Sequence, residues 1–249
     1  MKLGCIIQAR MGSTRFPGKM NKEFHNGKTI LDVIVEKMKL TFSNEQIILA
    51  TSDDLQNQKL IKKCKEHSIN SFVGSENDVL SRFIECAKKF SLTHIVRVCG
   101  DNPFLIEEMN NELLKEFYKN NTYDYYSYYV KDTPSILTHF GFWFEIVGVN
   151  ALKKVQKVTS DPLYHEHVTN YIYQNKDQFK IKSILLDSFF EENTDKRFTV
   201  DTEEDFHTCS IIYKNFCNQK IDPIILFNFV NKSKSMSQLM HEQINRNIK

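Results

Sequence analysis

The sequence lacks the features that mark several common protein classes. Its six cysteines form no CxxC pair and have no histidine at zinc-ligand spacing, so they are expected to be reduced, mostly buried thiols. No apolar run reaches about 18 residues, and the N-terminus has no signal-peptide pattern, so we expect a cytoplasmic protein without a membrane segment. Lysine and arginine total 33 against 31 acidic residues, a net charge of +2. This balance argues against a general nucleic-acid binder, and any phosphate binding must be local.

Strand-like and helix-like segments alternate through the first half of the chain. The β-rich runs are LGCIIQA, QIILAT, NSFVG and HIVRVCG. Between them lie amphipathic helical patterns at residues 30–40, from about 54, at 79–90 and at 106–119. This βαβ rhythm predicts an α/β fold, a three-layer domain whose mostly parallel sheet is flanked by helices.

The pattern changes in the second half of the chain. The aromatic-rich segments YDYYSYYV and HFGFWFEIV predict strands, partly antiparallel, that wall a pocket. The segments expected next are helices at 151–158 and 164–175, a strand FKIKSILL, a short strand RFTVD and a helix at 203–216. The tail from residue 222 to 249 predicts one or two peripheral helices used in packing or self-association.

The loop after the first strand, QARMGSTRFPGK at residues 8–19, combines two glycines, two hydroxyls and three cations. Glycine permits close backbone approach and unusual dihedrals, hydroxyls donate hydrogen bonds, and the cations match phosphate oxygens. The residues concerned are Gly12, Gly18, Ser13, Thr14, Arg10, Arg15 and Lys19. The order is neither that of a Walker loop nor GxGxxG. At the carboxyl end of a first strand, this clustering predicts a triphosphate-binding loop rather than a solvated basic loop.

The segment IIQARMGSTRFPGKM resembles the opening signature of the cytidylyltransferases that activate sugar acids, especially the branch called spore-coat polysaccharide biosynthesis protein F-like. The resemblance continues in family order through ATSDD, ENDVLSRF, RVCGDNPFL, EHVTNYIY and RFTVDTEEDF, over roughly residues 3–215. It implies a nucleotidyltransferase domain related to the GT-A fold over residues 1–220. Within that domain, a small antiparallel acceptor and dimerisation segment is expected at about 123–175, and a C-terminal helical extension follows at 221–249. The implied enzyme is often a homodimer and uses CTP and Mg²⁺.

Two aspartates, Asp101 after HIVRVCG and Asp201 after RFTV, stand at the ends of expected strands. Magnesium prefers oxygen ligands and is typically held by one or two carboxylates together with substrate phosphates, so this pair is chemically sufficient. From the residues alone, each aspartate is more readily interpreted as a helix N-cap, because helical patterns follow both. The resemblance implies that both bind the metal.

The resemblance also implies which side chains surround the nucleotide and which carry catalysis. The alternatives are that Asp53 or Asp54 caps the following helix and that Arg82 pairs with Glu85 or Asp78 on a helix surface. Arg97 is expected to reach a phosphate or to brace the metal aspartate. The nucleotide-binding residues expected are Ala9, Arg10, Gly12, Ser13, Arg15, Lys19, Thr51, Ser52, Asp53, Ser81, Arg82, Arg97 and Asp101, and the catalytic ones are Arg10, Lys19, Asp101 and Asp201.

The acceptor side departs from the family pattern. Many relatives carry G-L-D-V-E-V where this chain has GFWFEI at residues 141–146, which places Trp143 where an aspartate is common. Trp143 and Glu145 are therefore expected to contact the acceptor, with core packing as the alternative for the tryptophan. Glu166 and His167, in the segment EHVT, are further expected acceptor residues. The HEH run lacks the i, i+4 spacing of a two-histidine metal site.

The expected reaction is transfer of CMP from CTP to a sugar acid or related small acceptor, with release of pyrophosphate, for bacterial surface polysaccharide biosynthesis. Two alternatives stay open. One is a nucleotidyltransferase acting on a phosphorylated or otherwise unusual acceptor, and the other is a GT-A glycosyltransferase that uses a nucleotide-sugar. Neither a nucleic acid nor a membrane is an expected partner.

Overall fold

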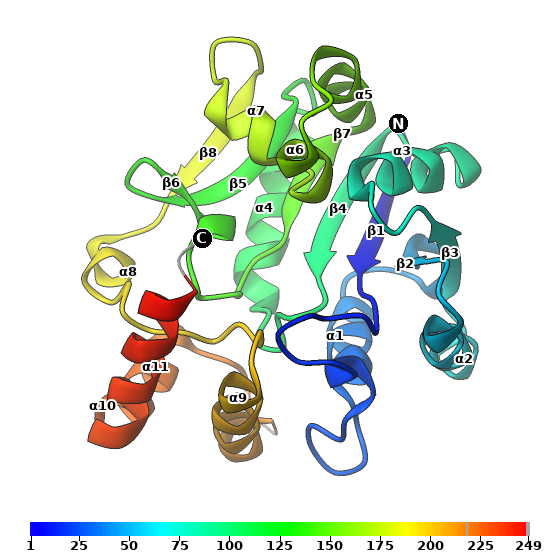
Figure 1. Cartoon of the computed structure of the whole chain (residues 1–249). Coiled ribbons are helices and arrows are strands. Elements are labelled where there is room, and N and C mark those ends of the chain that lie inside the picture. Colours follow the sequence, from blue (N-terminus) through cyan, green and yellow to red (C-terminus); the bar gives the residue numbers. More distant parts are fainter. Residues whose placement is uncertain (218, 248–249) are drawn as a thin grey trace.

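The computed structural model describes residues 1–217 and 219–247 and contains an eight-stranded mixed sheet (Figure 1). Its strands are β1 (Leu3–Gln8), β2 (Ile47–Ser52), β3 (Asn70–Gly74), β4 (His94–Cys99), β5 (Tyr125–Val130), β6 (Thr133–Pro134), β7 (Glu145–Gly148) and β8 (Ile181–Leu185). The order is β3-β2-β1-β4-β7-β5-β6, with β8 paired to β5. Strands β1 to β4 run parallel, whereas β7 runs antiparallel to both β4 and β5.

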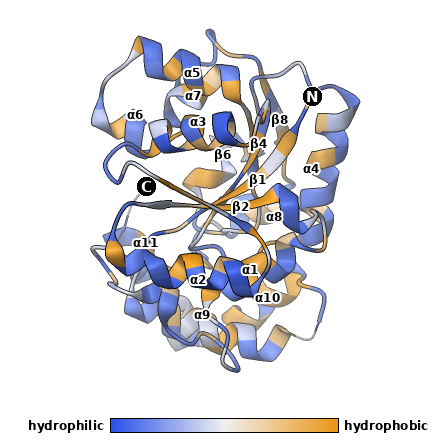
Figure 2. Ribbon diagram, turned by 90° about the vertical axis from the view of Figure 1, so that its right-hand side faces the viewer, coloured by the Kyte–Doolittle hydropathy of each residue, from blue (hydrophilic) through white to orange (hydrophobic). Residues whose placement is uncertain are grey.

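Helices cover both faces of this sheet, which confirms the predicted three-layer α/β fold (Figure 2). One face carries α3 (Val79–Lys89), α5 (Val149–Val158), α6 (Pro162–Glu166) and α7 (Asn170–Gln174). The other carries α1 (Ile30–Met38), α2 (Gln58–Glu66), α4 (Glu107–Lys119), α8 (Ser188–Glu192), α9 (Glu203–Phe216), α10 (Pro223–Asn231) and α11 (Lys234–Arg246). Short 3-10 turns lie at η1 (Lys19–Asn21), η2 (Asn44–Gln46), η3 (Leu55–Asn57) and η4 (Ser135–Leu137).

Each central strand contributes to two hydrophobic cores because its side chains alternate between the faces of the sheet. In β1, Cys5 and Ile7 lie in the core beneath α1 and α4, whereas Ile6 lies in the core beneath α3 and α5. Burial on both faces is what a parallel strand between two helical layers requires. The sheet is therefore a rigid frame for the loops that leave its strand ends.

Three predicted elements are wrong in detail. Residues 197–201, predicted as a strand, have no regular secondary structure and join no ladder of the described sheet; instead the amides of residues 198–200 bond the carbonyls of His139 and Asp101. Of the segment HFGFWFEIV, only β7 is a strand, because Gly141 adopts a φ of 64° and turns the chain away from the ladder. The helix predicted at 164–175 is divided into α6 and α7, and the turn between them carries residues 167–169.

The C-terminal helices α10 and α11 form where the tail predicted them, but they share the main core, because Phe227 packs against Phe142 and Phe198. Residue 218 of the predicted domain and residues 248–249 of the predicted extension lie outside the described residues. The division at residue 220 stays a prediction. In the described part of the chain, no helix has both the length and the apolar character needed to cross a bilayer.

Candidate active site

A cleft of about 620 Å³ opens at the carboxyl ends of β1 and β4. The chain leaves β1 for β2 on one side and returns to β4 on the other, so this is the point where the strand order reverses and where open α/β sheets bind ligands. The cleft brings together residues from distant parts of the sequence. The predicted site residues that line it are Ala9, Arg10, Ser13, Arg15, Lys19, Arg82, Arg97, Asp101, Glu166, His167 and Asp201.

The two loops that form the base of the cleft approach closely because of Gly100. Its amide donates to the Gln8 carbonyl at 2.9 Å. A Cβ at this position would lie 2.7 Å from the same carbonyl oxygen and 2.9 Å from the Ala9 Cβ, contacts that side chains do not tolerate. Gly100 therefore allows the end of β4 to touch the start of the cationic loop.

An asparagine that carried no signal in the sequence fixes the cationic loop. The Asn57 Oδ1 accepts a hydrogen bond from the Met11 amide at 2.8 Å, and its Nδ2 donates to the Ser52 carbonyl at 2.8 Å. The buried side chain thus ties the loop to the end of β2. Gly18 adopts a φ of 72°, as a permissive glycine should, whereas Gly12 is not among the described residues with positive φ.

Three cations converge on the Asp201 carboxylate. The Arg15 Nη2 lies 2.8 Å from Oδ1, the Lys19 Nζ lies 4.0 Å from the same oxygen, and the Arg197 Nη2 lies 2.8 Å from Oδ2. Lys19 also donates to the Val200 carbonyl at 2.5 Å. The Arg15 side chain is 50% exposed and the Arg197 side chain only 1% exposed, so one arginine lies in the cleft and the other lies behind the carboxylate.

The buried Arg197 holds Asp201 in place. Its Nε and Nη2 donate to the two oxygens of Asp205 at 2.7 and 2.9 Å, and its Nη1 contacts His139. Burial by itself would lower the pKa of Arg197, but the hydrogen bonds and charges of Asp205 and Asp201 outweigh it and raise that pKa. The arginine is therefore a permanent cation. Its spacing of four residues to Asp201 and eight to Asp205 was visible in the sequence.

The capping interpretation of the two aspartates is wrong. Thr202 is the N-cap of α9, in a capping box with Asp205, and Ile106 stands at the N-cap of α4. The Val200 amide donates to the Asp101 carbonyl at 2.9 Å, so the two aspartate segments lie side by side. Both side chains line the cleft.

Several predicted nucleotide residues lie away from the cleft. Thr51 and Ser52 are buried at the end of β2, and Asp53 is exposed beyond it. Ser81 lies in the first turn of α3, where its amide donates to the N-cap Asp78. The described lining of the cleft includes neither these four residues nor Gly12.

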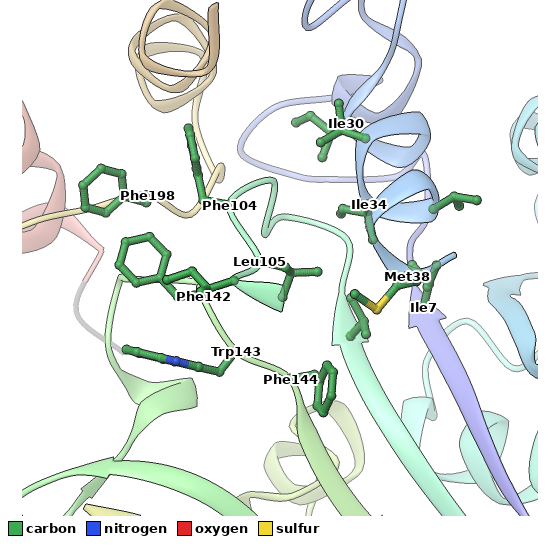
Figure 3. Packing of buried hydrophobic residues seen from close by; sticks show 14 of the residues in the cluster. Ile7, Ile30, Ile34, Met38, Phe104, Leu105, Phe142, Trp143, Phe144 and Phe198 are labelled. Carbon is green, nitrogen blue, oxygen red and sulfur yellow. The ribbon is translucent and has the colours of Figure 1, made fainter. Parts of the chain in front are cut away.

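Trp143 does not face the acceptor side of the cleft and is a core residue. It is 4% exposed, its Nε1 lies 3.2 Å from the Met109 sulfur, and its ring packs against those of Phe142 and Phe190. Figure 3 shows the indole in the same layer as Phe142, Phe198 and Phe104. The core alternative therefore holds for this residue in place of the predicted acceptor contact, because the indole is buried among aromatic rings.

Glu145 also lies outside the cleft lining, directly beneath its floor. One oxygen accepts from the Arg97 Nη1 at 2.6 Å, and the other accepts from the Thr169 hydroxyl at 3.1 Å and from the Tyr125 hydroxyl. Both Arg97 and Thr169 line the cleft, whereas Glu145 is fully buried. The geometry thus corrects Glu145 from acceptor contact to support of the floor. Arg97 pairs with Glu145 and Gln8 instead of bracing Asp101.

The comparison with known families decides the identity of this fold and site. The model of the family described as cytidylyltransferase matches residues 4–241. The chain belongs to the cytidylyltransferase family.

Relatives of this cytidylyltransferase include one named bacterial protein and two solved structures. The spore coat polysaccharide biosynthesis protein SpsF of Bacillus subtilis is 29% identical over 84% of this chain and 85% of its own. A cytidylyltransferase structure from Leptospira borgpetersenii superposes with a TM-score of 0.84 at 27% identity, covering 96% of this chain and 97% of that one. The fold, at 14% identity and a TM-score of 0.63, is also that of a CMP:2-keto-3-deoxy-manno-octonic acid synthetase complexed with CTP, over 86% and 99% of the two chains.

In this cytidylyltransferase, several residues from η4, α6, α7 and the turn between the two helices also line the cleft. The sequence predicted only two of them. Glu166 and His167 line the cleft together with Leu163, Thr169, Asn170, Tyr173, Ile136 and Leu137, and their contact with an acceptor stays a prediction. His167, Thr169 and Asn170 lie at the division between α6 and α7, which the predicted continuous helix did not contain. Thr169, Asn170 and Tyr173 belong to the segment EHVTNYIY, whose family resemblance was their one signal in the sequence.

Three residues that line the cleft carry buried polar atoms without a partner among the described residues: the Nε atoms of Arg82 and Arg97 and the Oδ1 of Asn170. Burial and the nearby charge of Arg10 lower the pKa of Arg82 to about 10. Unsatisfied buried groups are rare in folded proteins and cluster where a ligand or ion completes them. The cleft therefore suits an anionic, hydrogen-bonding ligand.

Proposed function

We propose that this cytidylyltransferase transfers CMP from CTP to a sugar acid, with release of pyrophosphate, in the synthesis of a bacterial surface polysaccharide. The observation that carries the proposal is the convergence of Arg15, Lys19, Asp101 and Asp201 in one cleft at the ends of β1 and β4. The name of the SpsF relative supports the polysaccharide pathway, and the sugar acid after which the similar synthetase is named supports the acceptor class.

The nucleotide half of the cleft supplies positive charge to the triphosphate. Lys19 and Arg15 lie within 4.0 Å of Asp201, and Arg10 of the same loop also lines the cleft, 3.9 Å from Glu76. The acceptor oxygen attacks the α-phosphorus in line, the bond from that phosphorus to the bridging oxygen of the β-phosphate breaks, and pyrophosphate leaves. The acceptor hydroxyl gives its proton to solvent. The cations of the loop stabilise the charge that develops on the leaving pyrophosphate.

The two aspartates fit a magnesium ion of the kind that phosphate substrates bring with them. No group of three or more acidic, histidine or cysteine side chains gathers as a metal site in residues 1–217 and 219–247. Two carboxylates on adjoining segments of one cleft nevertheless match the oxygen ligands of Mg²⁺, with phosphate oxygens and water completing the shell. Asp101 and Asp201 would hold the ion, which would neutralise phosphate charge and orient the reacting groups.

The acceptor half offers hydrogen-bonding groups between apolar walls. The Asn170 Oδ1 is buried without a partner among the described residues and can accept a hydrogen bond from an acceptor hydroxyl. Glu166, the last residue of α6, and His167, in the turn that follows, line the same cleft. Leu137 and Leu163 give the apolar surface that covers the carbon side of a sugar ring.

Pyrophosphate release in the presence of CTP, Mg²⁺ and one candidate acceptor at a time tests this proposal. The panel contains 2-keto sugar acids, sugar phosphates and neutral sugars, and Asn170→Ala serves as the acceptor-side variant. We expect pyrophosphate release with a sugar acid. Asn170→Ala should raise the KM for that acceptor and leave the KM for CTP unchanged. Release only with a sugar phosphate would replace the acceptor class, and hydrolysis of a nucleotide-sugar without use of CTP would favour the glycosyltransferase.

The family resemblance further supports a homodimer, which we include in the proposal. Multi-angle light scattering at micromolar concentration should give twice the chain mass of 29.3 kDa. A mass of one chain over the whole concentration range would reject the dimer without affecting the proposed reaction.

A further inference from the structure

The end of the C-terminal helix α11 reaches the candidate active site. Asn247, which follows α11 directly, lines the same cleft as Arg15, Lys19 and Asp201. Figure 1 shows α11 in red beside α9, the helix whose N-terminus follows Asp201. The cytidylyltransferase family model ends at residue 241, so this contact lies beyond the matched region.

The position of Asn247 is fixed from inside the protein. Its Nδ2 donates to the Gln243 carbonyl at 2.9 Å and lies 3.3 Å from the Gln243 Oε1. Gln243 is 3% exposed, and its Oε1 accepts from the Thr202 hydroxyl at 3.4 Å. Because Thr202 follows Asp201, this chain of hydrogen bonds ties the end of α11 to the segment that carries the proposed metal ligand.

Arg15 is held by two partners of different chemistry. Its Nη1 donates to the Asn247 Oδ1 at 2.8 Å, and its Nη2 donates to the Asp201 Oδ1 at 2.8 Å. A half-exposed arginine loses considerable side-chain entropy when a ligand orders it. Asn247 accepts through a neutral amide oxygen, so it orients the guanidinium without neutralising its charge. Only one of these two guanidinium nitrogens bonds the aspartate, and that nitrogen is the one a phosphate oxygen would engage.

We infer that Asn247 is a positioning residue for the triphosphate. Its side chain holds the Arg15 guanidinium at the cleft through Nη1, while the Arg15 Nη2 exchanges the Asp201 carboxylate for a phosphate oxygen. The inference rests on the proposed function, since it takes CTP as the ligand and Asp201 as a magnesium ligand. It assigns α11 to the nucleotide site, in place of the peripheral packing or self-association expected from the sequence.

The test is isothermal titration calorimetry of the full chain with CTP and with CMP, both in the presence of Mg²⁺. Asn247→Ala should weaken CTP binding by roughly 3- to 10-fold, the value of one lost hydrogen bond, and leave CMP binding unchanged. Asn245→Ala is the matched control, because it removes the same side chain from an exposed site two residues earlier on α11. The control should bind both nucleotides like the wild type.

A double-mutant cycle separates positioning from a structural effect. In an Arg15→Ala background, Asn247→Ala should cause no further loss of CTP affinity, because the side chain acts through Arg15. Equal losses in both backgrounds, equal effects of Asn245→Ala and Asn247→Ala, or tighter CTP binding by Asn247→Ala would each overturn the inference. Failure of the wild-type chain to bind CTP would instead refute the proposed function, so the two failures are distinguishable.

Discussion

Arg15 and Arg197 contact the same carboxylate at the same distance, yet we expect their removal to affect different properties. Removal of Arg197 should lower stability, and removal of Arg15 should weaken CTP binding. Each lies 2.8 Å from one oxygen of Asp201. The Arg197 side chain is 1% exposed and bonds Asp205 as well, whereas the Arg15 side chain is 50% exposed. Replacement of each arginine by methionine keeps a long side chain and removes only the charged group, so Arg197→Met and Arg15→Met form a matched pair.

The magnitudes follow from burial. Arg197→Met leaves two buried carboxylates without their common cation, which costs about 3–5 kcal/mol of unfolding free energy. For a chain of this size, that loss lowers Tm by roughly 6–20 °C. Arg15→Met breaks a half-exposed ion pair and should cost at most about 1 kcal/mol. It should instead weaken CTP binding roughly 10- to 100-fold, because a hydrogen bond to a charged phosphate is lost.

Urea denaturation, thermal melting and calorimetric titration with CTP and Mg²⁺ on the two variants check this contrast. We expect Arg197→Met to lose more stability than Arg15→Met. Among the molecules that remain folded, we expect Arg15→Met to lose more CTP affinity than Arg197→Met. Equal losses of stability would show that burial does not distinguish the two arginines. Unchanged CTP affinity in Arg15→Met would remove this residue from the nucleotide site.

Three further predictions concern packing, the loop contact and pH. Gly100→Ala should weaken CTP binding at least about tenfold by calorimetry, because its Cβ would lie 2.7 Å from the Gln8 carbonyl and must push the two loops apart. Trp143→Ala should lower the unfolding free energy by about 3–5 kcal/mol in urea titrations and leave the KM for CTP unchanged, since the indole fills the core. Burial by itself would raise the pKa of Asp32, but hydrogen bonds from Lys63, Thr29 and His67 lower it from 3.8 to about 2. The stabilisation from this carboxylate is thus present above about pH 4 and lost as pH falls toward about 2, so the Asp32→Asn variant should show a flatter loss of stability with acid than the wild type.

The local patterns of the sequence were enough to predict the parallel part of the sheet and a cationic loop at the end of its first strand. The β-rich run of β1 and the cations of residues 8–19 are both local features, and the structure places cations of this loop in the lining of the cleft. Asp101 and Asp201 were predicted to share a site from the family resemblance, and both line one cleft.

The features that the sequence did not predict depend on contacts between distant segments. Trp143 was expected at the acceptor because it stands where relatives carry an aspartate, but its ring packs against Phe142 and Phe190 in the core. Asn57 and Asn247 contact the cationic loop from 46 and 232 residues away, and nothing in their neighbourhoods marks them. Glu145 belongs to a buried pair with Arg97, which is directly opposite in the antiparallel register of β4 and β7. This pairing could not be predicted from the sequence, because it depends on β7 lying next to β4 in the sheet.

The most direct test of the proposed reaction is mass spectrometry of the product after the protein is incubated with CTP, Mg²⁺ and a panel of 2-keto sugar acids. We expect a CMP–sugar acid conjugate formed in equal amount to pyrophosphate, and no conjugate from the folded Asp201→Asn variant. A conjugate only with sugar phosphates, or undiminished product from Asp201→Asn, would contradict the sugar-acid acceptor and the two-aspartate site respectively.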